Sequence, residues 1–396
     1  MKVAFLTSGG VAPCLSASIA YLIKEYSAID NSIEFYAYKH GYKGLLLGNK
    51  ISIPNNLSNK TDAIASFGGS AIGNSRVKLT NINDCIKNKY IKQNELPVEV
   101  AAKQLASDQI NILHTIGGDD TNTAASDLVK YLKTNNYDLT VVGLPKTIDN
   151  DVFPISQTLG ASTASEQGAI FFNNIVNENT TSSRQLIIHE IMGRNCGWLT
   201  AATAYEYRKL LKEKEFVSEL MIDEKRWDIH GIYLPEKEID FNKECIRLNA
   251  IMDKYDCVNI FLSEGAGLDT IINEMKSNNE SIKYDAFGHV RLDEINPGQW
   301  FAKNFKDKLN ADKVLVQKSG YFSRSAAPNK KDIELIKKTV KLAVKSALNS
   351  NSGVVAMDED NKNLISCIDF NRIKGGKPFN INTDWFIKIL NEIGQK

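Results

Sequence analysis

Five short loops contain the residues whose types and spacing are best suited to chemistry. They are Thr7–Gly10, Gly117–Thr121, Pro145–Asp151, Met192–Arg194 and Ser263–Gly265, and each follows a short apolar, β-rich run. Ligands of open α/β sheets bind outside the carboxyl ends of the strands, so all five loops lie where such folds place their sites. A single Gly pair only indicates a turn. The interpretation therefore rests on the joint placement of the loops.

Two of these loops are acidic. Asp119 and Asp120 are adjacent at the start of an expected helix, while Asp149 and Asp151 follow Lys146 at another strand end. Either Asp119 or Asp120 taken alone could simply cap the helix. Two acidic loops on neighbouring strand ends instead favour a Mg²⁺–phosphate complex, because a hard cation prefers carboxylate and phosphate oxygens.

The same region offers backbone donors for an anion. Gly10 and Gly118 each precede an expected helix, where N–H groups can reach a ligand without a Cβ in the path and the helix dipole favours negative charge. If one carboxylate holds a metal and another takes a proton from an attacking hydroxyl, the minimum for phosphoryl transfer is present. The chain has no GxxxxGK[ST] sequence and no GxGxxG after the first strand, so a phosphate would be bound in another way.

Composition excludes several other classes of function. The chain has 396 residues, of which 43% are hydrophobic and 24% charged, and its formal net charge is +1. This composition indicates a globular protein of about two domains, without the positive field of proteins that bind nucleic acids or membrane surfaces non-specifically. No apolar run approaches the roughly 18 residues that cross a bilayer, and the N-terminal apolar stretch is too short for a signal peptide. We therefore expect a cytoplasmic protein with no nucleic-acid or membrane partner.

The elements that must position these loops alternate along the chain. The β-rich run Val3–Leu6 precedes a helical pattern at Ser16–Tyr26, and Ile112–Ile116 precedes one at Thr121–Leu132. Such alternation is typical of parallel sheets covered by helices. The sequence thus predicts an α/β protein with two Rossmann-like domains, whose mainly parallel sheets face each other across an active-site cleft.

Several motifs together resemble the phosphofructokinases. The matching motifs, in the order and at the approximate spacing of that family, are Gly117–Thr121, Pro145–Asp151, Met192–Gly197, Glu264–Gly265 and Tyr321–Arg324. The resemblance covers essentially the whole chain. Two further stretches, Phe287–Val290 and Asn296–Gly298, are similar to bacterial-type single-subunit forms of the pyrophosphate-dependent branch.

Two residues assign the branch. ATP-dependent relatives resemble this chain but have Gly at the positions of Asp120 and Lys146. A carboxylate at Asp120 would fill the space of the α-phosphate of ATP and repel the anion, whereas Lys146 would place an ammonium group against the phosphoryl being transferred. The resemblance therefore implies pyrophosphate as the phosphoryl donor.

The implied reaction is reversible transfer of a phosphoryl group from pyrophosphate to the 1-hydroxyl of D-fructose 6-phosphate, which yields fructose 1,6-bisphosphate and phosphate. The resemblance makes Asp149 the general base and Asp119 the ligand of the cofactor Mg²⁺, while Asp120 and Lys146 select pyrophosphate over ATP. The implied donor contacts are Gly10, Arg76 and Lys146. The implied contacts of the sugar phosphate are Thr147, Asp149, Met192, Gly193, Arg194, Glu264, Tyr321 and Arg324.

The resemblance also assigns the domains and an assembly. We expect residues 1–155 plus about 313–352 to bind pyrophosphate and Mg²⁺, and residues 156–312 plus about 353–396 to bind the sugar phosphate. In the family an arginine reaches the sugar phosphate of a neighbouring subunit, which implies a homodimer or homotetramer. Gln185 stands at that position here, so Arg184, one residue earlier, is only a candidate for the contact.

Three alternatives remain open at this point. The chain could be an ATP-dependent phosphofructokinase, or an NAD kinase-like protein, which shares a Gly-Gly-Asp loop but lacks the Pro145–Asp151 and Met192–Arg194 motifs. It could also be a non-catalytic sugar-phosphate sensor or regulatory subunit. A sensor would bind its ligands without turnover.

Overall fold

The computed structural model describes residues 1–283 and 291–395 of the chain. The chain divides into two compact units, the first comprising residues 1–164 and 324–377 and the second comprising residues 165–323 and 378–396. The Phe287–Val290 stretch of the sequence interpretation lies outside the described residues. In the part of the chain that is described, no helix has both the length and the apolar character that a bilayer crossing needs.

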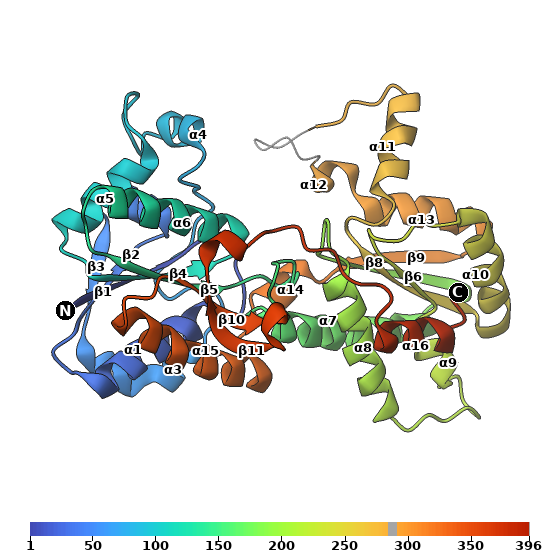
Figure 1. Cartoon of the computed structure of the whole chain (residues 1–396). Coiled ribbons are helices and arrows are strands. Elements are labelled where there is room, and N and C mark those ends of the chain that lie inside the picture. Colours follow the sequence, from blue (N-terminus) through green and yellow to red (C-terminus); the bar gives the residue numbers. More distant parts are fainter. Residues whose placement is uncertain (284–290, 396) are drawn as a thin grey trace. The chain divides into compact units, whose positions relative to one another are not determined.

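The first unit is built on a seven-stranded sheet (Figure 1). The strands, in spatial order, are β11 (Leu364–Ile368), β10 (Gly353–Asp358), β5 (Thr140–Pro145), β4 (Ile112–Gly117), β1 (Lys2–Thr7), β2 (Glu34–Tyr38) and β3 (Lys50–Ile53). The pairs from β10 to β2 are parallel, and only the edge strands β11 and β3 pair antiparallel. Strands β4 and β5 are buried along their whole length, as expected for parallel strands covered by helices on both faces.

Helices cover both faces of this sheet (Figure 1). On one face α1 (Leu15–Ile29) packs against α3 (Thr61–Ala65) and α15 (Lys330–Leu348). On the other face α5 (Pro97–Ser107) packs against α2 (Tyr42–Leu46) and α6 (Asp119–Thr134). The remaining short helices of this unit are α4 (Ile82–Lys87), η1 (Asn55–Lys60), η3 (Glu359–Asn361) and η4 (Phe370–Arg372).

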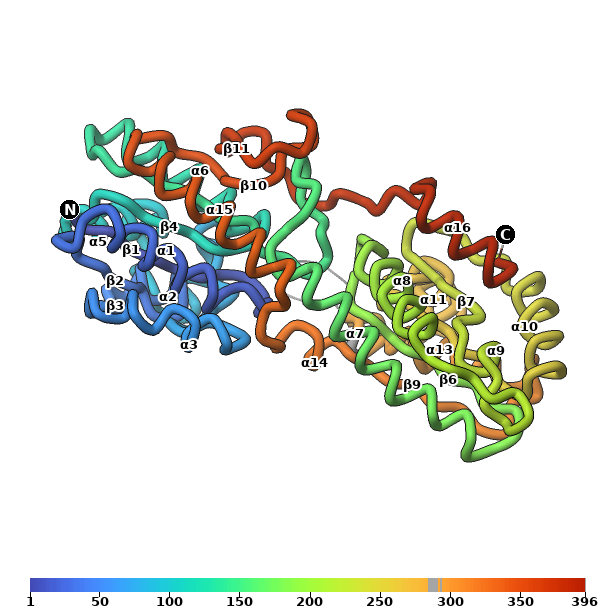
Figure 2. The backbone as a smooth tube through the Cα atoms, turned by 90° about the horizontal axis from the view of Figure 1, so that it is seen from below, coloured from blue at the N-terminus to red at the C-terminus, as the bar shows by residue number. Residues whose placement is uncertain are grey.

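The second unit is built on a four-stranded, wholly parallel sheet. Its order is β7 (Gly231–Tyr233), β8 (Cys257–Ser263), β6 (Gln185–Ile191) and β9 (Lys313–Lys318). The chain enters this unit along α7 (Ala161–Ile175) and η2 (Val176–Thr180). Its other helices are α8 (Trp198–Lys212), α9 (Glu224–Trp227), α10 (Phe241–Tyr255), α11 (Leu268–Ser277), α12 (Leu292–Ile295), α13 (Pro297–Lys308), α14 (Gly320–Arg324) and α16 (Asp384–Glu392). All but α12 are labelled in Figure 2.

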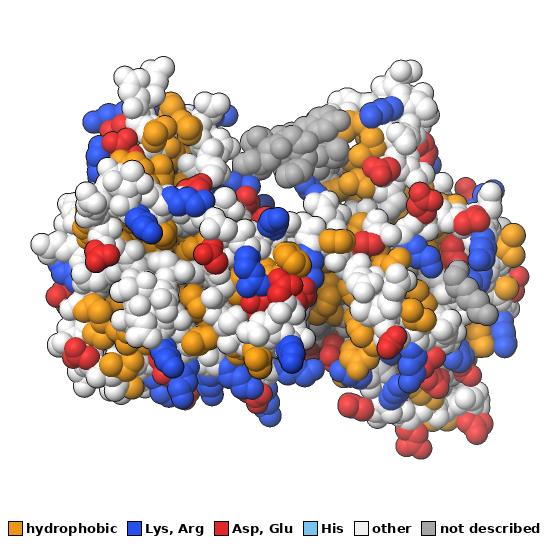
Figure 3. Space-filling model, viewed as in Figure 1, with side chains coloured by type: hydrophobic (Ala, Val, Ile, Leu, Met, Phe, Trp, Pro, Cys, Tyr) orange, Lys and Arg blue, Asp and Glu red, His pale blue; other side chains and the backbone are white. Residues whose placement is uncertain are grey.

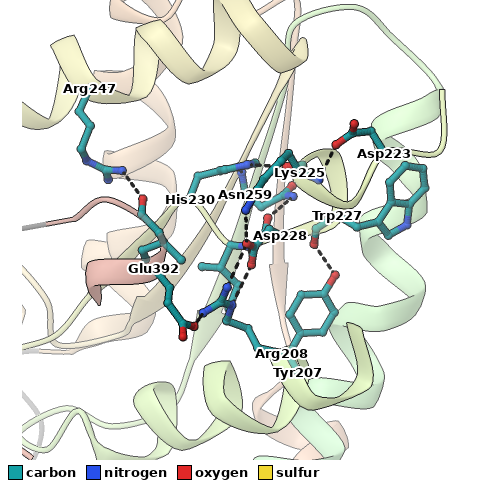
Figure 4. A network of polar contacts seen from close by, with 12 residues as sticks. Tyr207, Arg208, Asp223, Lys225, Trp227, Asp228, His230, Arg247, Asn259 and Glu392 are labelled. Carbon is teal, nitrogen blue, oxygen red and sulfur yellow. Dashed lines mark hydrogen bonds and ion pairs between the residues drawn. The ribbon is translucent and has the colours of Figure 1, made fainter. Parts of the chain in front are cut away.

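A polar network ties the C-terminal helix α16 into the second unit (Figure 4). The buried carboxylate of Asp228 accepts hydrogen bonds of 3.0 and 3.2 Å from Nε and Nη2 of Arg208 on α8. The guanidinium of Arg208 also pairs with Glu392, which ends α16. The network therefore links the end of α16 to α8 through the Arg208 guanidinium.

The fold class predicted from the sequence is confirmed, because both units are α/β with mainly parallel sheets. In the last quarter of the chain, the boundaries between the two units differ from the expected domain boundaries. Strand β9 completes the sheet of the second unit, and β10 and β11 extend the sheet of the first unit, where Gly353 pairs with Val142. An apolar strand pattern shows that a segment is buried but does not say which open sheet edge it joins. The cleft expected between the domains stays a prediction.

Charged side chains of both signs are interspersed over the face shown in Figure 3. Lys and Arg side chains gather along the lower edge at the left of this view, Asp and Glu side chains gather at the lower right, and both signs occur elsewhere on this face. This agrees with the formal net charge of +1.

Asp332 connects the returning helix α15 to the start of α7. Its buried carboxylate accepts hydrogen bonds from the backbone N of Gly160 (3.1 Å) and from the backbone N and Oγ1 of Thr163 (2.8 and 2.5 Å). Asp332→Ala leaves these buried donors without their acceptor, so we expect the free energy of unfolding to fall by about 3 kcal/mol. Urea unfolding followed by circular dichroism measures this loss. Glu334→Gln, an exposed change on the same helix, should unfold as the wild type does; equal losses would refute the assignment.

Candidate active site

The ends of three adjacent strands bring the predicted donor-site loops together in the first unit. Strands β1, β4 and β5 run parallel, with Thr7 level with Ile116 and Gly117 level with Pro145. The residues that follow them, Gly9–Gly10, Gly118–Asp120 and Lys146–Asp151, therefore emerge at one edge of the sheet. The register of the sheet, rather than any one motif, places these groups side by side.

Lys146 lies at the centre of this edge and is only 4% exposed. Its Nζ donates a 2.5 Å hydrogen bond to the carbonyl oxygen of Gly10. At Gly9 a Cβ would lie 3.0 Å from Nζ, and the φ of +90° is strained for any other residue. Burial, together with the charge of Arg76, lowers the pKa of Lys146 to about 8, although Cys14 and Asp149 oppose the shift. The Gly-Gly loop thus makes room for a buried cation.

The acidic loop after β5 is held by its own polar side chains. The Thr147 Oγ1 donates to Oδ1 of Asp151 at 3.0 Å and accepts from the backbone N of Asp149 at 3.1 Å. Thr158 Oγ1 in turn donates to the Thr147 carbonyl oxygen at 2.8 Å and to Asn150 Oδ1 at 3.1 Å. These bonds set the direction of Asp149 and Asp151 relative to β5.

Asp119 and Asp151 form the candidate metal-binding pair. Asp119 is the first residue of α6, and burial raises the pKa of Asp151, to which the nearby charge of Asp119 adds. Across residues 1–283 and 291–395, no group of three or more His, Cys, Asp or Glu side chains could hold a metal by itself. Magnesium is usually held by one or two carboxylates plus substrate phosphates, so this donor set fits Mg²⁺ bound together with a phosphate ligand.

The charge of the Asp120 side chain is compensated by an ion pair. Its carboxylate is 54% exposed and pairs with Lys78 Nζ at 2.5 Å. Two residues before Lys78, the exposed side chain of Arg76 has its Nη2 3.9 Å from the position of a Cβ at Gly10. The structure therefore brings Gly10, Arg76, Asp120 and Lys146 to one region, and adds Lys78, which the sequence reasoning missed because no motif marks it.

The predicted sugar-phosphate residues of the second unit gather at the ends of β6 and β8. Ile191 is level with Ser263, so Gly193 and Glu264 follow adjacent strands. The backbone N of Gly193 donates to Glu264 Oε1 at 3.3 Å, and the Ser263 Oγ donates to the Gly193 carbonyl oxygen at 2.5 Å. Burial raises the pKa of Glu264, while the bond from Gly193 opposes the shift. Glu264 is thus a fixed acceptor.

Arg194 and Gly265 pack closely beside this pair. A Cβ at Gly265 would lie 1.7 Å from the Arg194 carbonyl oxygen, so the two backbones touch. A hollow of about 470 Å³ opens beside them, with Asn195, Lys237 and Thr270 in its lining. A neighbouring hollow of about 200 Å³, near Tyr233 and Phe386, shares Lys237 with the first but is lined by none of the predicted site residues.

Tyr321 and Arg324 lie one turn apart on α14. Tyr321 is 73% exposed, and Gly320 before it approaches Met192, whose Cε would lie 2.8 Å from a Cβ at Gly320. The second unit therefore brings Met192, Gly193 and Glu264 together. Arg324 is the first residue of the last segment of the first unit. We predicted from the sequence that the site residues of both units act on the same two substrates, and this stays a prediction.

Arg184 is engaged within its own chain. Its guanidinium donates to Asn310 O and Asp253 Oδ1 at 2.8 Å and to Leu309 O at 2.6 Å. It precedes β6, whereas Met192 follows that strand at the opposite end. Gln185 is fully buried. These contacts favour a structural role for Arg184 rather than a reach toward another subunit.

Comparisons with known proteins agree with this arrangement of residues. The family model described as phosphofructokinase matches residues 2–347. The chain is 56% identical to the pyrophosphate–fructose 6-phosphate 1-phosphotransferase of Methylomonas methanica, over 100% of this chain and 96% of that protein. It is 50% identical to the protein of that name from Propionibacterium freudenreichii, over 100% of this chain and 98% of that protein.

A solved structure shows the same fold. The pyrophosphate-dependent phosphofructokinase of Marinobacter aquaeolei superposes with a TM-score of 0.69 at 21% identity, covering 99% of this chain and 91% of that one. Since the family model spans most of the sequence and full-length relatives share half or more of its residues, this chain belongs to the phosphofructokinase family.

Proposed function

We propose that this chain transfers a phosphoryl group reversibly from pyrophosphate to the 1-hydroxyl of D-fructose 6-phosphate. The observation on which the proposal rests is the buried ammonium of Lys146 against Gly10, beside two acidic loops. Relatives of 50% identity and more have the name pyrophosphate–fructose 6-phosphate 1-phosphotransferase, which supports the same donor and acceptor. We also propose that the enzyme is cytoplasmic and acts as a homodimer or homotetramer.

The donor side supplies positive charge for two phosphates. Lys146 and Arg76 bind pyrophosphate oxygens, and the backbone at Gly10 adds a contact without a side chain in the way. Asp119, with Asp151 near it, would hold Mg²⁺, which when bound neutralises phosphate charge and polarises the bond to the leaving phosphate. Because the ammonium of Lys146 is already buried, its attraction for the charge that develops in the transition state is little screened by water.

Asp149 is the general base in this proposal. As the sugar 1-hydroxyl oxygen attacks the phosphorus, its proton passes to the Asp149 carboxylate, and the bond between phosphorus and the bridging oxygen of pyrophosphate breaks to release phosphate. Thr147 bonds to the backbone N of Asp149 and to the Asp151 carboxylate, so it holds the backbone at Asp149 and the side chain of Asp151. Thr147 is therefore a positioning group as well as a proposed sugar contact.

Nucleotides are excluded by volume rather than by charge alone. The Lys78–Asp120 ion pair compensates the charge that the sequence interpretation gave to Asp120. The paired side chains still fill the space that a glycine at position 120 would leave open for an α-phosphate. Asp120 and Lys146 thus act together, the first by closing the nucleotide path and the second by binding the shorter donor.

The acceptor side is proposed to bind the sugar phosphate. Glu264 accepts hydrogen bonds from sugar hydroxyls, while Arg194 and Arg324 bind phosphate oxygens and Tyr321 donates its hydroxyl. Met192 and Gly193 line the sugar. The alternatives are an ATP-dependent phosphofructokinase, and a sensor that binds sugar phosphate without turnover.

The donor assignment is tested by comparing pyrophosphate with ATP in a coupled assay of fructose 1,6-bisphosphate formation with Mg²⁺. We expect kcat/KM for pyrophosphate to exceed that for ATP by about a hundredfold or more. The double variant Asp120→Gly with Lys146→Gly should lose about a hundredfold in pyrophosphate activity, because it loses a charge that stabilises the transition state. Equal use of ATP by the wild type, binding of both substrates without turnover, or unchanged kinetics of the double variant would each contradict the proposal.

A variant without the proposed general base tests whether turnover is lost while binding of fructose 6-phosphate is kept. Asp149→Ala should lower kcat by about a thousandfold, since no other group is proposed to take the hydroxyl proton. Calorimetric titration with fructose 6-phosphate should still detect binding. Asp138→Asn, a change at an exposed carboxylate before β5, is the matched control and should keep full activity. A kcat of Asp149→Ala within tenfold of the wild type would show that this residue is not the base.

The pH dependence follows from the lowered pKa of Lys146, about 8. The ammonium charge is present below this pKa and is lost above it, so kcat/KM for pyrophosphate, which reports the free enzyme, should fall as the pH rises through about 8. Lys146→Met should have a lower kcat/KM and lack this falling limb. If the variant keeps the same falling limb as the wild type, another group titrates.

A further inference from the structure

A loop near the end of the first unit lies against the candidate metal site. The backbone of Lys374 forms two hydrogen bonds with that of Phe153, of 2.8 and 3.0 Å, just after the acidic loop. The backbone N of Lys377 donates to the Asp151 carbonyl oxygen at 2.9 Å, and its Nζ donates to the Ile155 carbonyl oxygen at 2.8 Å. The segment Lys374–Lys377 is therefore fastened to the acidic loop at both ends.

Between these anchors, Gly375 touches Asp119. A Cβ at Gly375 would lie 1.8 Å from Oδ2 of Asp119, 2.5 Å from its Cγ and 2.8 Å from its Cβ, whereas Cβ atoms essentially never approach another heavy atom within 3.0 Å. Gly375 does not have a left-handed φ, whereas its neighbour Gly376 does, at +75°, with nothing within 4 Å of its Cβ position. Gly376 is thus explained by its backbone, but Gly375 is explained only by the carboxylate that it meets.

The contact limits where the Asp119 carboxylate can point. With the backbone of Gly375 against one face of the side chain, the carboxylate cannot swing toward Lys374–Lys377 without collision. Its orientation is therefore set by a segment more than 250 residues later in the chain. The family model matches residues 2–347 and does not include this segment.

We propose that Gly375 is a positioning residue for the metal: its backbone holds the Asp119 carboxylate in the direction in which it binds Mg²⁺ together with pyrophosphate. The inference rests on the proposed function, because it takes Asp119 as the metal ligand. Residues that orient a metal ligand usually change metal affinity by about 10- to 100-fold when they are altered. A Cβ at Gly375 forces either the carboxylate to rotate or the loop to withdraw, and both displace the ligand.

The test measures metal binding rather than activity. Mn²⁺ in place of Mg²⁺ is titrated into the full chain with inorganic pyrophosphate and no sugar phosphate, and free Mn²⁺ is followed by electron paramagnetic resonance. Asp119→Ala identifies the part of the binding that depends on this ligand. We expect Gly375→Ala to raise the Mn²⁺ dissociation constant about tenfold or more. Gly376→Asn is the control in the same loop: its Cβ position is open, and asparagine adopts a left-handed φ more readily than other side chains, so its Mn²⁺ affinity should stay close to that of the wild type.

Thermal unfolding checks the physical cause. The destabilisation by Gly375→Ala should be smaller in the Asp119→Ala background than in the wild type, because the colliding carboxylate is gone. If Gly375→Ala does not fold, Lys377→Met replaces it: this change removes the hydrogen bond of Nζ to Ile155 and its ion pair with Glu359. Lys377→Met should also weaken Mn²⁺ binding, because the loop loses an anchor.

Four outcomes overturn the inference. They are wild-type Mn²⁺ affinity in Gly375→Ala, an equal loss in Gly376→Asn, wild-type affinity in Lys377→Met when Gly375→Ala does not fold, and Mn²⁺ binding that Asp119→Ala does not change. The proposed function fails separately, if the wild type does not form fructose 1,6-bisphosphate from pyrophosphate. Metal binding by the variants decides the positioning role in either case.

Discussion

The burial of the Lys146 ammonium is the constraint on which the candidate donor site depends. A charge that is 4% exposed is costly unless the protein supplies partners. The Gly10 carbonyl oxygen supplies one directly, and the carboxylates of Asp149 and Asp151 lie near enough to favour the charged form. Without a side chain at Gly9, the loop can approach Nζ closely. Burial of one lysine thus accounts for the glycine at position 9 and benefits from the carboxylates of the acidic loop.

The same constraint makes the site depend on segments far apart in sequence. Strands β1, β4 and β5 place the Gly-Gly turn, Asp119 and Lys146 at one sheet edge because they pair in register. Strands β10 and β11 extend that sheet, and the chain that follows them brings Gly375 against Asp119. Asp119, the proposed metal ligand, therefore contacts a segment from near the end of the chain. A carboxylate held in this way loses little freedom when it binds a cation.

Sequence reasoning was successful for the positions of the loops that follow the central strands, because these positions depend on local residue type and spacing. It placed Lys146, Asp119 and Asp149 after strands, and the structure brings them to one edge. It was less successful in assigning the late strands to a unit. Strands β10 and β11 belong to the first unit and β9 belongs to the second, whereas the opposite was expected. Lys78 and Gly375 were missed because neither stands in a motif. Their importance arises only from what they contact, Asp120 for the first and Asp119 for the second.

The sequence by itself determined the family, the α/β class and the types of group available for phosphate and metal chemistry, because motifs and hydrophobic periodicity are local properties of the chain. Only the tertiary structure decided how these groups are paired: that Lys146 is buried against Gly10, that Lys78 compensates Asp120, that Arg184 is engaged within its own unit, and that Gly375 limits Asp119. The physical reason is that burial, ion pairing and steric contact depend on residues brought together from distant parts of the chain, and no local pattern encodes which residues will meet.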